Sequence, residues 1–404
     1  MDCGPVNTHL HNTTPIARTT RRTARRVFAL VLGPALVATV VGVVLLWPDD
    51  PPPTIPAAPG GTTTLVVTVT VTDPAAADPL QPEVAARDGD RDITVVVPPE
   101  YLPELHAGDR IRVVQVPDMA PGFSPYVFQD FDRRPPMGWL AALFVVLVAV
   151  VARWRGLASL LGLGIGLGVV WWFTLPALLV GRPAVGVGLV SASAIMFATL
   201  YLAHGFTLRT STALAGTLVG LVATAGLAAW ASGAAHLTGL SDEYALDLMS
   251  YAPAMQLRSV LLAGTLLAGL GVLNDTTITQ ASAVWELQAA DPNATRRRLF
   301  AQGMRIGRDH IASTIYTIAF AYVGATLPLV LLVSMSTDIP LLQAVTSGEL
   351  AEEVARTLVG SIGLVLAIPL TTAIAALVVT SSHHPAQRGD QREHVAAQAG
   401  AGCE

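Results

Sequence analysis

The polar residues whose types and spacing could support chemistry in this chain are concentrated near residue 280. Four of them recur at spacings of four, three and four residues, so one face of a single helix carries them all: Asp275, Thr279, Ser282 and Glu286. Small residues continue the same face toward its N-terminal side: Gly264, Ala268 and Gly271. Carboxylate and hydroxyl groups aligned in this way could bind a cation or pass a proton, which predicts a path for a substrate or an ion.

A second polar face follows shortly afterwards in the sequence. Its members again follow spacings of three and four residues and therefore share one side of a helix: Gly303, Gly307, His310, Thr314 and Thr317. Charged residues lie among them: Arg305, Arg308 and Asp309. Because two antiparallel helices that are adjacent in sequence tend to pack on each other, we expect the two polar faces to meet.

Two other interpretations use the same residues. Asp275 and Glu286 could mark a solvated helix end, because the apolar run before them stops just ahead of Asn274. The arginines and the aspartate of the second face would then be interfacial anchors. Alternatively, the adjacent Asp309 and His310 could act as the acid and the base of an intramembrane enzyme.

Recognisable enzyme motifs are absent from the sequence. It has no phosphate-binding loop, no HExxH pattern and no GxSxG turn. Cys3 and Cys403 lie at opposite ends of the chain, so neither a disulfide framework nor a thiolate metal site is expected. The net charge of −5 gives no argument for nucleic-acid binding. We therefore expect no enzyme activity, no cofactor, no metal centre and no nucleic-acid partner.

The composition places these residues in a membrane. Hydrophobic residues make up 52% of the chain and charged residues only 13%, whereas a soluble domain has about 25% charged residues. Uncharged apolar stretches of about 20 residues can span a bilayer. Eight candidates occur, of which the second and sixth are short and must extend into polar neighbours: Val27–Trp47, Trp139–Ala152, Leu157–Val180, Ala184–Ala203, Ala213–Ala231, Ser259–Leu273, Ile311–Met335 and Thr357–Val379. The sequence therefore predicts an all-α polytopic bundle of eight transmembrane helices.

Arginine and tryptophan residues predict the orientation of these spans. With the N-terminus in the cytoplasm, most arginines near span ends are cytoplasmic, and the short external loops hold only Arg182, Arg258 and Arg356. Every tryptophan lies at or near a span end, as an aromatic belt requires. An even number of spans returns the chain to its starting side, so both termini are expected to be cytoplasmic.

The segment between the first two spans has a different periodicity. It opens with a Pro-rich stretch from Pro48 to Pro59, which is typical of a semi-rigid tether. Four later stretches have the alternation or the β-branched composition of strands: Thr62–Thr72, Arg91–Val97, Asp109–Val116 and Tyr126–Phe131. These features predict a small external β-rich domain, either a barrel or a sandwich.

The predicted organisation has five parts. A basic cytoplasmic tail (1–26) and a transmembrane anchor (27–47) precede the external domain with its tether (48–136), a seven-helix transmembrane domain (137–380) and a cytoplasmic tail (381–404). The extremes, residues 1–17 and 383–404, are polar or rich in small residues and are expected to be disordered. Nothing joins the histidine pairs in these tails into a metal site: His9 with His11, and His383 with His384.

Several short motifs follow one another in a characteristic order. The central ones are Gly271–Asp275, Ser282 with Glu286, and Gly303–Asp309. Flanking residues extend the pattern: Gly108-Asp109, Tyr126 with Asp130, His204-Gly205, Ala321-Tyr322 with Gly324 and Pro328, Glu349, Glu352, Arg356 and Pro369. Over residues 62–380 the chain resembles the YibE/F family of bacterial integral membrane proteins, although an apolar residue is expected in place of Asn274. The resemblance implies a multi-span protein with an external β domain and suggests a permease-like role.

The residues leave three functions open. The first is a permease or secondary transporter of the bacterial plasma membrane, with a path for a small molecule or an ion between the sixth and seventh predicted spans. The second is an envelope scaffold whose external domain binds a partner. The third is the intramembrane enzyme described above, acting on lipid or envelope precursors. The expected partners are the lipid bilayer, the substrate, and either a second copy of the chain or an envelope protein.

Overall fold

The protein consists of two compact units. The computed structural model describes residues 18–55, 62–72, 82–117, 124–241, 244–335 and 340–381. One unit comprises Met1–Pro53 with Ala158–Glu404, and the other comprises Thr54–Leu157. The tails that were expected to be disordered, with both cysteines and both histidine pairs, lie outside the described residues.

The smaller unit contains a closed five-stranded barrel. Its strands are β1 (Thr63–Val71), β2 (Glu83–Asp88), β3 (Arg91–Val96), β4 (Arg110–Gln115) and β5 (Tyr126–Phe131). They follow the order β1-β2-β3-β5-β4, in which β1 pairs with β4, and β3 and β5 are parallel. A 3-10 helix, η1 (Pro99–Glu104), connects β3 to β4. This is the strand order of the OB-fold, so the predicted small β domain is a barrel and not a sandwich.

Side chains that alternate along the strands fill the barrel. Val67 and Val69 of β1 and Ile111 of β4 are at most 1% exposed, as a period of two residues requires. Phe128 of β5 is also buried, and its ring centroid lies 5.0 Å from that of Tyr101. The sequence does not predict β2, because its residues EVAARD combine charges and alanines of low β-propensity. Pairing with β1 and β3 holds this segment in the sheet.

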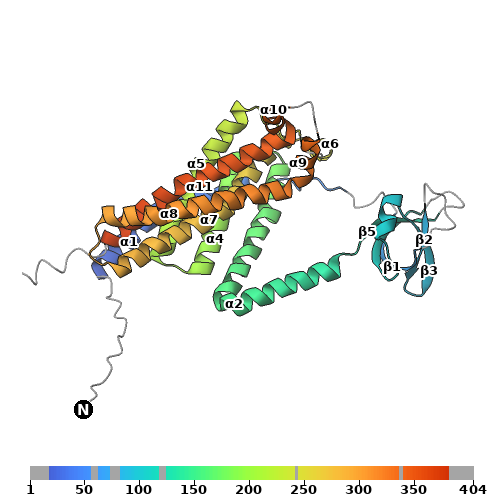
Figure 1. The fold of residues 1–404 in the computed structure, drawn as a ribbon, viewed down its shortest axis with the longest axis horizontal. Helices are drawn as coiled ribbons and strands as arrows, with labels where there is room; N and C mark the ends of the chain where they lie inside the picture. Colours follow the sequence, from blue (N-terminus) through green and yellow to red (C-terminus); the bar gives the residue numbers. More distant parts are fainter. Residues whose placement is uncertain are drawn as a thin grey trace, which may run out of the picture. The chain divides into compact units, whose positions relative to one another are not determined.

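The larger unit is a bundle of long helices (Figure 1). Helix α1 (Arg18–Leu46) precedes the barrel in the chain, and α2 (Arg134–Val169) follows it, with only the part from Ala158 onward belonging to the larger unit. The later elements are η2 (Val170–Thr174), α3 (Leu175–Leu179), α4 (Ala184–His204), α5 (Leu208–Ala234), α6 (Ala245–Tyr251), α7 (Leu257–Ala290), α8 (Arg296–Ala325), α9 (Leu327–Ser334), α10 (Leu341–Val345) and α11 (Gly348–Ser381). Helix α7 packs against α4, α5, α8 and α11, which makes it the central helix of this unit.

The number of candidate spans differs from the predicted eight. Among the described residues, six helices are long and apolar enough to cross a membrane, or seven if α8 and α9 form one span. The second and third predicted spans lie in one helical run of 46 residues, Arg134–Leu179. At about 1.5 Å per residue this run is about 69 Å long, more than twice the thickness of a hydrocarbon core. The backbone at Arg153 is non-helical (φ 54°, ψ −140°), so the run is interrupted between the two predicted spans.

Two further predicted spans have different boundaries in the structure. The seventh is a bent pair, because the axes of α8 and α9 differ by 75°. Pro328 lies in the first turn of α9, where it lacks an amide hydrogen and disfavours a continuous helix. The sixth, Ser259–Leu273, belongs to α7, which continues without a break to Ala290. The polar residues after Leu273 therefore lie within a helix and not beyond its end.

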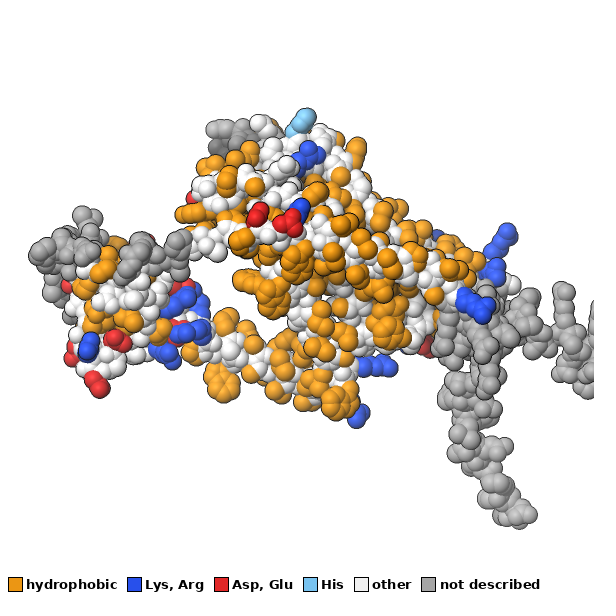
Figure 2. Space-filling model, turned by 180° about the vertical axis from the view of Figure 1, so that it is seen from behind, with side chains coloured by type: hydrophobic (Ala, Val, Ile, Leu, Met, Phe, Trp, Pro, Cys, Tyr) orange, Lys and Arg blue, Asp and Glu red, His pale blue; other side chains and the backbone are white. Residues whose placement is uncertain are grey.

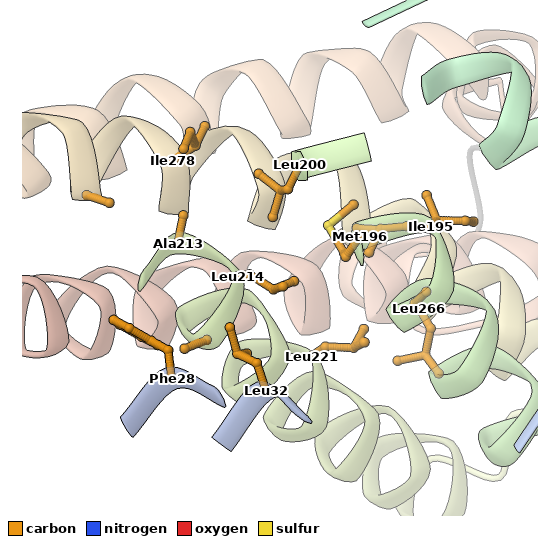
Figure 3. Close-up of a cluster of buried hydrophobic side chains, with 14 of the residues drawn as sticks. Phe28, Leu32, Ile195, Met196, Leu200, Ala213, Leu214, Leu221, Leu266 and Ile278 are labelled. Carbon is orange, nitrogen blue, oxygen red and sulfur yellow. The ribbon is translucent and has the colours of Figure 1, made fainter. Parts of the chain in front are cut away.

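Hydrophobic side chains from four helices form the main core of the bundle. Figure 3 shows this cluster, which includes Phe28 of α1, Met196 of α4, Leu214 of α5 and Leu266 of α7. All four side chains are at most 8% exposed. The core therefore joins the N-terminal helix to helices that are distant from it in sequence.

Glycine residues bring the helices of this unit close together. A Cβ atom at Gly216 of α5 would overlap Thr371 Oγ1 of α11. At Gly307 of α8 a Cβ atom would lie 2.6 Å from Ile368 Cγ2 of α11. Small residues at such contacts allow close packing of helices in lipid, where the hydrophobic effect does not drive helices together.

The outer faces of the helices are largely apolar. The exposed residues include Val222 and Trp230 on α5, and Leu358, Ile362 and Leu366 on α11. Figure 2 shows hydrophobic side chains over most of the visible surface of the helical unit, with few charged ones among them. An apolar surface of this extent is unfavourable in water and is typical of a protein embedded in lipid.

Candidate functional site

The predicted polar face of α7 is the outward side of that helix. Asp275, Thr279 and Glu286 are exposed, while Ser282 is partly buried. The Ser282 hydroxyl donates a hydrogen bond to Ile278 O at 2.7 Å, within the same helix. Polar groups thus line one side of α7 over several turns.

Small residues extend this side of α7 away from Glu286. Nothing lies within 4 Å of a Cβ atom placed at Gly264 or at Gly271. These two glycines differ from those at helix contacts, because no neighbouring helix fills the space in front of them. We define the α7 stripe by four residues: Gly264, Gly271, Asp275 and Thr279.

Asp275 lies at the depth of the hydrocarbon core if α7, one of the candidate spans, crosses the bilayer. The charged residues toward the two ends of α7 are Arg258 and Glu286, and the latter pairs with Arg209 of α5 at 3.7 Å. Asp275 is 17 residues from Arg258 and 11 from Glu286, which corresponds to about 25 Å and about 17 Å of helix. Wherever a core of about 30 Å is placed between these ends, it includes Asp275.

At this depth the charge of Asp275 would be costly. A charged side chain at the centre of a membrane helix costs about 2.5–3.5 kcal/mol, and such residues normally face protein or a water-filled cavity. The reading of Asp275 as a solvated residue requires the membrane boundary to lie near it, with α7 continuing for 15 residues beyond the boundary to Ala290. The exposed Arg308 and Asp309 of α8 lie at nearly the level of Asp275.

The predicted polar face of α8 is divided between a helix contact and the surface. Gly303 and Gly307 are buried, and Gln280 of α7 lies against them. The Gln280 Nε2 group donates to Gly303 O at 2.8 Å and to Thr372 Oγ1 of α11 at 2.7 Å. The remaining members are exposed or only partly buried: Arg305, Arg308, Asp309 and Thr317 are exposed, and His310 and Thr314 are partly buried. Helix α8 therefore contacts α7 through its glycines and Gln280, and the expectation that the two polar faces meet is wrong.

His310 lies at nearly the same level of the bundle as Asp275. Taking the Gln280–Gly303 contact as the reference, Asp275 is five residues along α7 and His310 is seven residues along the antiparallel α8. These separations correspond to about 8 Å and about 10 Å in the same direction. Among the described residues, Asn274 Oδ1 and His310 Nε2 are buried without a hydrogen-bond partner. Unsatisfied polar groups thus occur on both helices near the level of Asp275.

A buried row of hydroxyl groups between α5, α7 and α11 is not predicted by the sequence analysis. The Thr217 and Thr277 hydroxyl groups lie 2.6 Å apart, and Thr371 Oγ1 is buried without a partner among the described residues. The signal in the sequence is a spacing of seven residues along α5: Thr210, Thr217 and Thr224. Thr217 also donates to Ala213 O at 2.9 Å, a bond that satisfies a hydroxyl group without water. This row is therefore primarily a packing feature.

A second polar cluster surrounds the start of α7 and the first turns of α11. Arg258 Nε donates to Ser232 Oγ at 2.9 Å, and the buried Glu352 accepts a hydrogen bond from Gly239 N at 2.8 Å. Arg356 pairs with Glu353 at 2.5 Å. Arg258 lines two pockets of about 380 Å³ and 400 Å³. The sequence predicts only that these two arginines lie in external loops; that each lines a pocket together with Ser232 is a feature of the fold.

The barrel has its own charge pairs near the end of β5. Arg134 donates to the buried Asp132 at 2.6 Å, and Arg110 lies 3.3 Å from the same carboxylate. The hydrogen bond from Arg134 outweighs the effect of burial and holds the pKa of Asp132 below its usual range. Among the described residues, no group of three or more His, Cys, Asp or Glu residues is arranged to hold a metal ion.

A bundle with apolar outer faces and six or seven candidate spans among its described residues defines this chain as a polytopic helical membrane protein. A family model described as YibE/F-like protein matches residues 140–381, which is more than half of the chain. The protein therefore belongs to the YibE/F family, and the predicted resemblance is confirmed. The match covers the helical part of the chain after the barrel. No curated protein and no solved structure matches the chain.

Proposed function

We propose that the chain is a permease-like protein of the bacterial plasma membrane that moves a small molecule or an ion along the α7 stripe. The observation that supports this proposal best is the exposed carboxylate of Asp275 within α7, a helix that is long and apolar enough to cross a membrane. Charged residues at this depth are costly, and they typically mark substrate pathways or proton relays. Membership of the YibE/F family supports a membrane protein but does not specify transport.

The side chains along α7 have distinct roles in this proposal. The Asp275 carboxylate binds a cation or accepts a proton within the membrane. Thr279 and Ser282 supply hydroxyl oxygens in the next two turns toward Glu286 and Arg209, which form one mouth of the path. Arg305, Arg308 and Asp309 of α8 add charges at about the levels of Thr279 to Asp275, and His310, Thr314 and Thr317 continue the polar side chains along α8 away from this mouth. The pockets beside Arg258 form the opposite mouth.

The energy for transport is not supplied by ATP hydrolysis on this chain. The sequence has no phosphate-binding loop, so the proposal assigns it no ATP hydrolysis and no other enzymatic activity. An ion gradient across the membrane, or a separate subunit, drives the movement. In the proposed orientation both termini are cytoplasmic and the barrel is external, which agrees with the distribution of arginine residues near the span ends.

A flux assay on the full chain tests the proposal. The purified protein is reconstituted into vesicles that contain a pH-sensitive dye, and a panel of cations and small organic solutes is added outside. The proposal predicts that at least one solute changes the internal pH or accumulates faster than in vesicles without protein. Identical fluxes in both kinds of vesicle across the panel, with correctly inserted protein, would contradict transport.

The separate compact barrel favours a second candidate function, an envelope scaffold. OB-fold barrels commonly bind extended ligands on their surface, and an external barrel could dock an envelope partner in the same way. Deleting residues 62–132 distinguishes the two functions. A scaffold loses its cellular phenotype with the barrel and keeps it in an Asp275→Asn variant, whereas a permease loses it in Asp275→Asn.

A further inference from the structure

We infer that a second copy of this chain covers the α7 stripe, so that the polar path lies between two copies. In a single chain the stripe is open, because Asp275 and Thr279 are exposed and the two glycines have nothing within 4 Å of a Cβ position. At the other helix contacts of the bundle, the space in front of glycines such as Gly216 and Gly307 is filled by side chains of α11. A row of small residues that leaves room for another helix is typical of helix association in membranes.

The covering surface must be polar at the depth of Asp275. This carboxylate has no ion pair or hydrogen bond among the described residues and lies within the candidate span α7. A charged group at that depth requires protein or water as its neighbour. An apolar helix laid over the stripe would exclude lipid but would leave the carboxylate unpaired.

Within the part of the chain that the structure describes, the other outward faces do not meet this requirement. The stretch 139–152 of α2 contains no charged, amide or hydroxyl side chain. The prominent exposed residues of the remaining faces are apolar: Leu30, Val37 and Val41 on α1, Val219, Val222 and Trp230 on α5, and Leu358, Ile362 and Leu366 on α11. Among the described helices, polar groups at the level of Asp275 are exposed on the α7–α8 side.

A second copy supplies such groups from its own α8. Arg308 and Asp309 are exposed there and lie within about 2 Å of the level of Asp275, and the partly buried His310 lies within about 3 Å of it. A two-fold axis along the membrane normal keeps residues of equal depth opposite each other, and each copy then contributes the same contacts to its partner. The α7 stripe of one copy would thus face the polar side of α8 in the other. The inference rests on the stripe used in the proposed function and names the partner that completes it.

Cysteine cross-linking of the full chain in membranes tests the inference. Cys3 and Cys403 are the only cysteines, so replacing both with serine gives a background for single substitutions. Thr279→Cys and Gly271→Cys place thiols on the stripe, and each is co-expressed with a chain that carries its thiol on an exposed α8 position of the same level, Arg305→Cys or Ala312→Cys. Val219→Cys and Leu366→Cys, co-expressed with the same α8 variants, place thiols on apolar faces as controls. Under mild oxidation we expect disulfide-linked dimers between the stripe and α8 positions and none with the controls. Equal cross-linking in all combinations, or none between the stripe and α8, would overturn the inference.

A second variant tests the same surface without a thiol. Gly271→Leu fills the open part of the stripe, whereas Gly226→Leu fills an equally open position on α5. By single-molecule photobleaching in vesicles, the wild-type chain and Gly226→Leu should be dimers, and Gly271→Leu should be a monomer. A wild-type monomer, or a dimer that Gly271→Leu leaves intact, contradicts the inference.

Two further outcomes separate this inference from its alternatives. Pairing Thr279→Cys with Leu143→Cys in one chain reports whether the first half of α2 covers the stripe; a cross-link within one chain would refute the second copy as the occupant.

Assembly is measured in these experiments independently of flux, so a dimer that transports nothing refutes only the proposed function. A monomer with full flux refutes only the second copy.

Discussion

Asp275 differs in its surroundings from two carboxylates of the bundle that form ion pairs. Glu286 pairs with Arg209 and Glu353 pairs with Arg356, in each case near an end of the bundle. Asp275 lies between these ends, exposed and without an ion pair among the described residues. A carboxylate in this position contributes nothing evident to stability, and this is the main reason to assign it a function.

At the residue scale we predict that Asp275→Asn abolishes flux. The substitution keeps the shape of the side chain and removes its charge, so expression and folding should be retained. Thr279→Val should lower flux by only about 2- to 10-fold, because one hydrogen bond contributes about 0.5–1.5 kcal/mol. Initial rates in reconstituted vesicles measure both effects, with Asp247→Asn on the exposed side of α6 as the control. Full flux in Asp275→Asn at normal protein levels would remove this residue from the mechanism.

At the scale of helices, we predict that a large side chain at Gly216 disrupts the close packing of α5 on α11. A side chain there would overlap Thr371, whereas nothing lies within 4 Å of a Cβ atom at Gly226 on the same helix. Gly216→Leu should therefore destabilise the bundle by about 1–3 kcal/mol through overpacking. Thermal unfolding in detergent, with Gly226→Leu as the matched control, measures the difference. Equal midpoints for the two variants would show that the α5–α11 contact is looser than described.

The barrel should lose stability in acid because of Asp132. Its pKa in the folded state is lowered by the hydrogen bond from Arg134, so the ionised carboxylate favours the folded state. This contribution is present at neutral pH, above the ordinary pKa of about 3.9, and is lost as the pH falls through the folded value. Denaturant unfolding of a fragment of residues 54–135 at pH 7 and pH 3 measures it. Asp132→Asn should reduce the pH dependence, and an unchanged dependence would assign it to other groups.

The features that the sequence predicts best are those set by periodicity within one element. Spacings of three and four residues identify the exposed side of α7, and alternation identifies β1 and β4. Contacts between elements are predicted less well. The polar faces of α7 and α8 do not meet, because Gln280 bonds to Gly303 and to Thr372 of a third helix, α11. No periodicity in α7 or α8 alone contains that information.

Breaks within elements are the other source of error. The bend between α8 and α9 follows from a single proline, Pro328, inside an otherwise apolar stretch. At Arg153 the two predicted spans are separated by a local change of backbone within one helical run, which hydropathy does not distinguish from a loop. Strand β2 depends on its neighbours and not on its own residues. In each case the boundary of the element depends on local backbone geometry or on strand pairing, and hydropathy contains no information on either.

At the scale of the whole molecule, the orientation in the membrane is a prediction with a direct test. In the cysteine-free background, Glu100→Cys marks the barrel and Ala289→Cys marks the end of α7 near Glu286. A membrane-impermeant thiol reagent added to intact cells should modify the first position and spare the second until the cells are permeabilised. The reverse pattern would invert the proposed orientation.

The central claim, that the α7 stripe is a polar path within the bilayer, is tested most directly by water access to Thr279. The full chain with Thr279→Cys as its single cysteine is reconstituted into vesicles and treated with a small, charged, water-soluble thiol reagent. Val219→Cys, exposed on the apolar face of α5, serves as the control. The account predicts that the reagent modifies Thr279→Cys, that Asp275→Asn in the same chain changes the rate, and that Val219→Cys stays unmodified. A Thr279→Cys thiol as unreactive as the control would contradict the account, because no water-filled path would then reach the stripe.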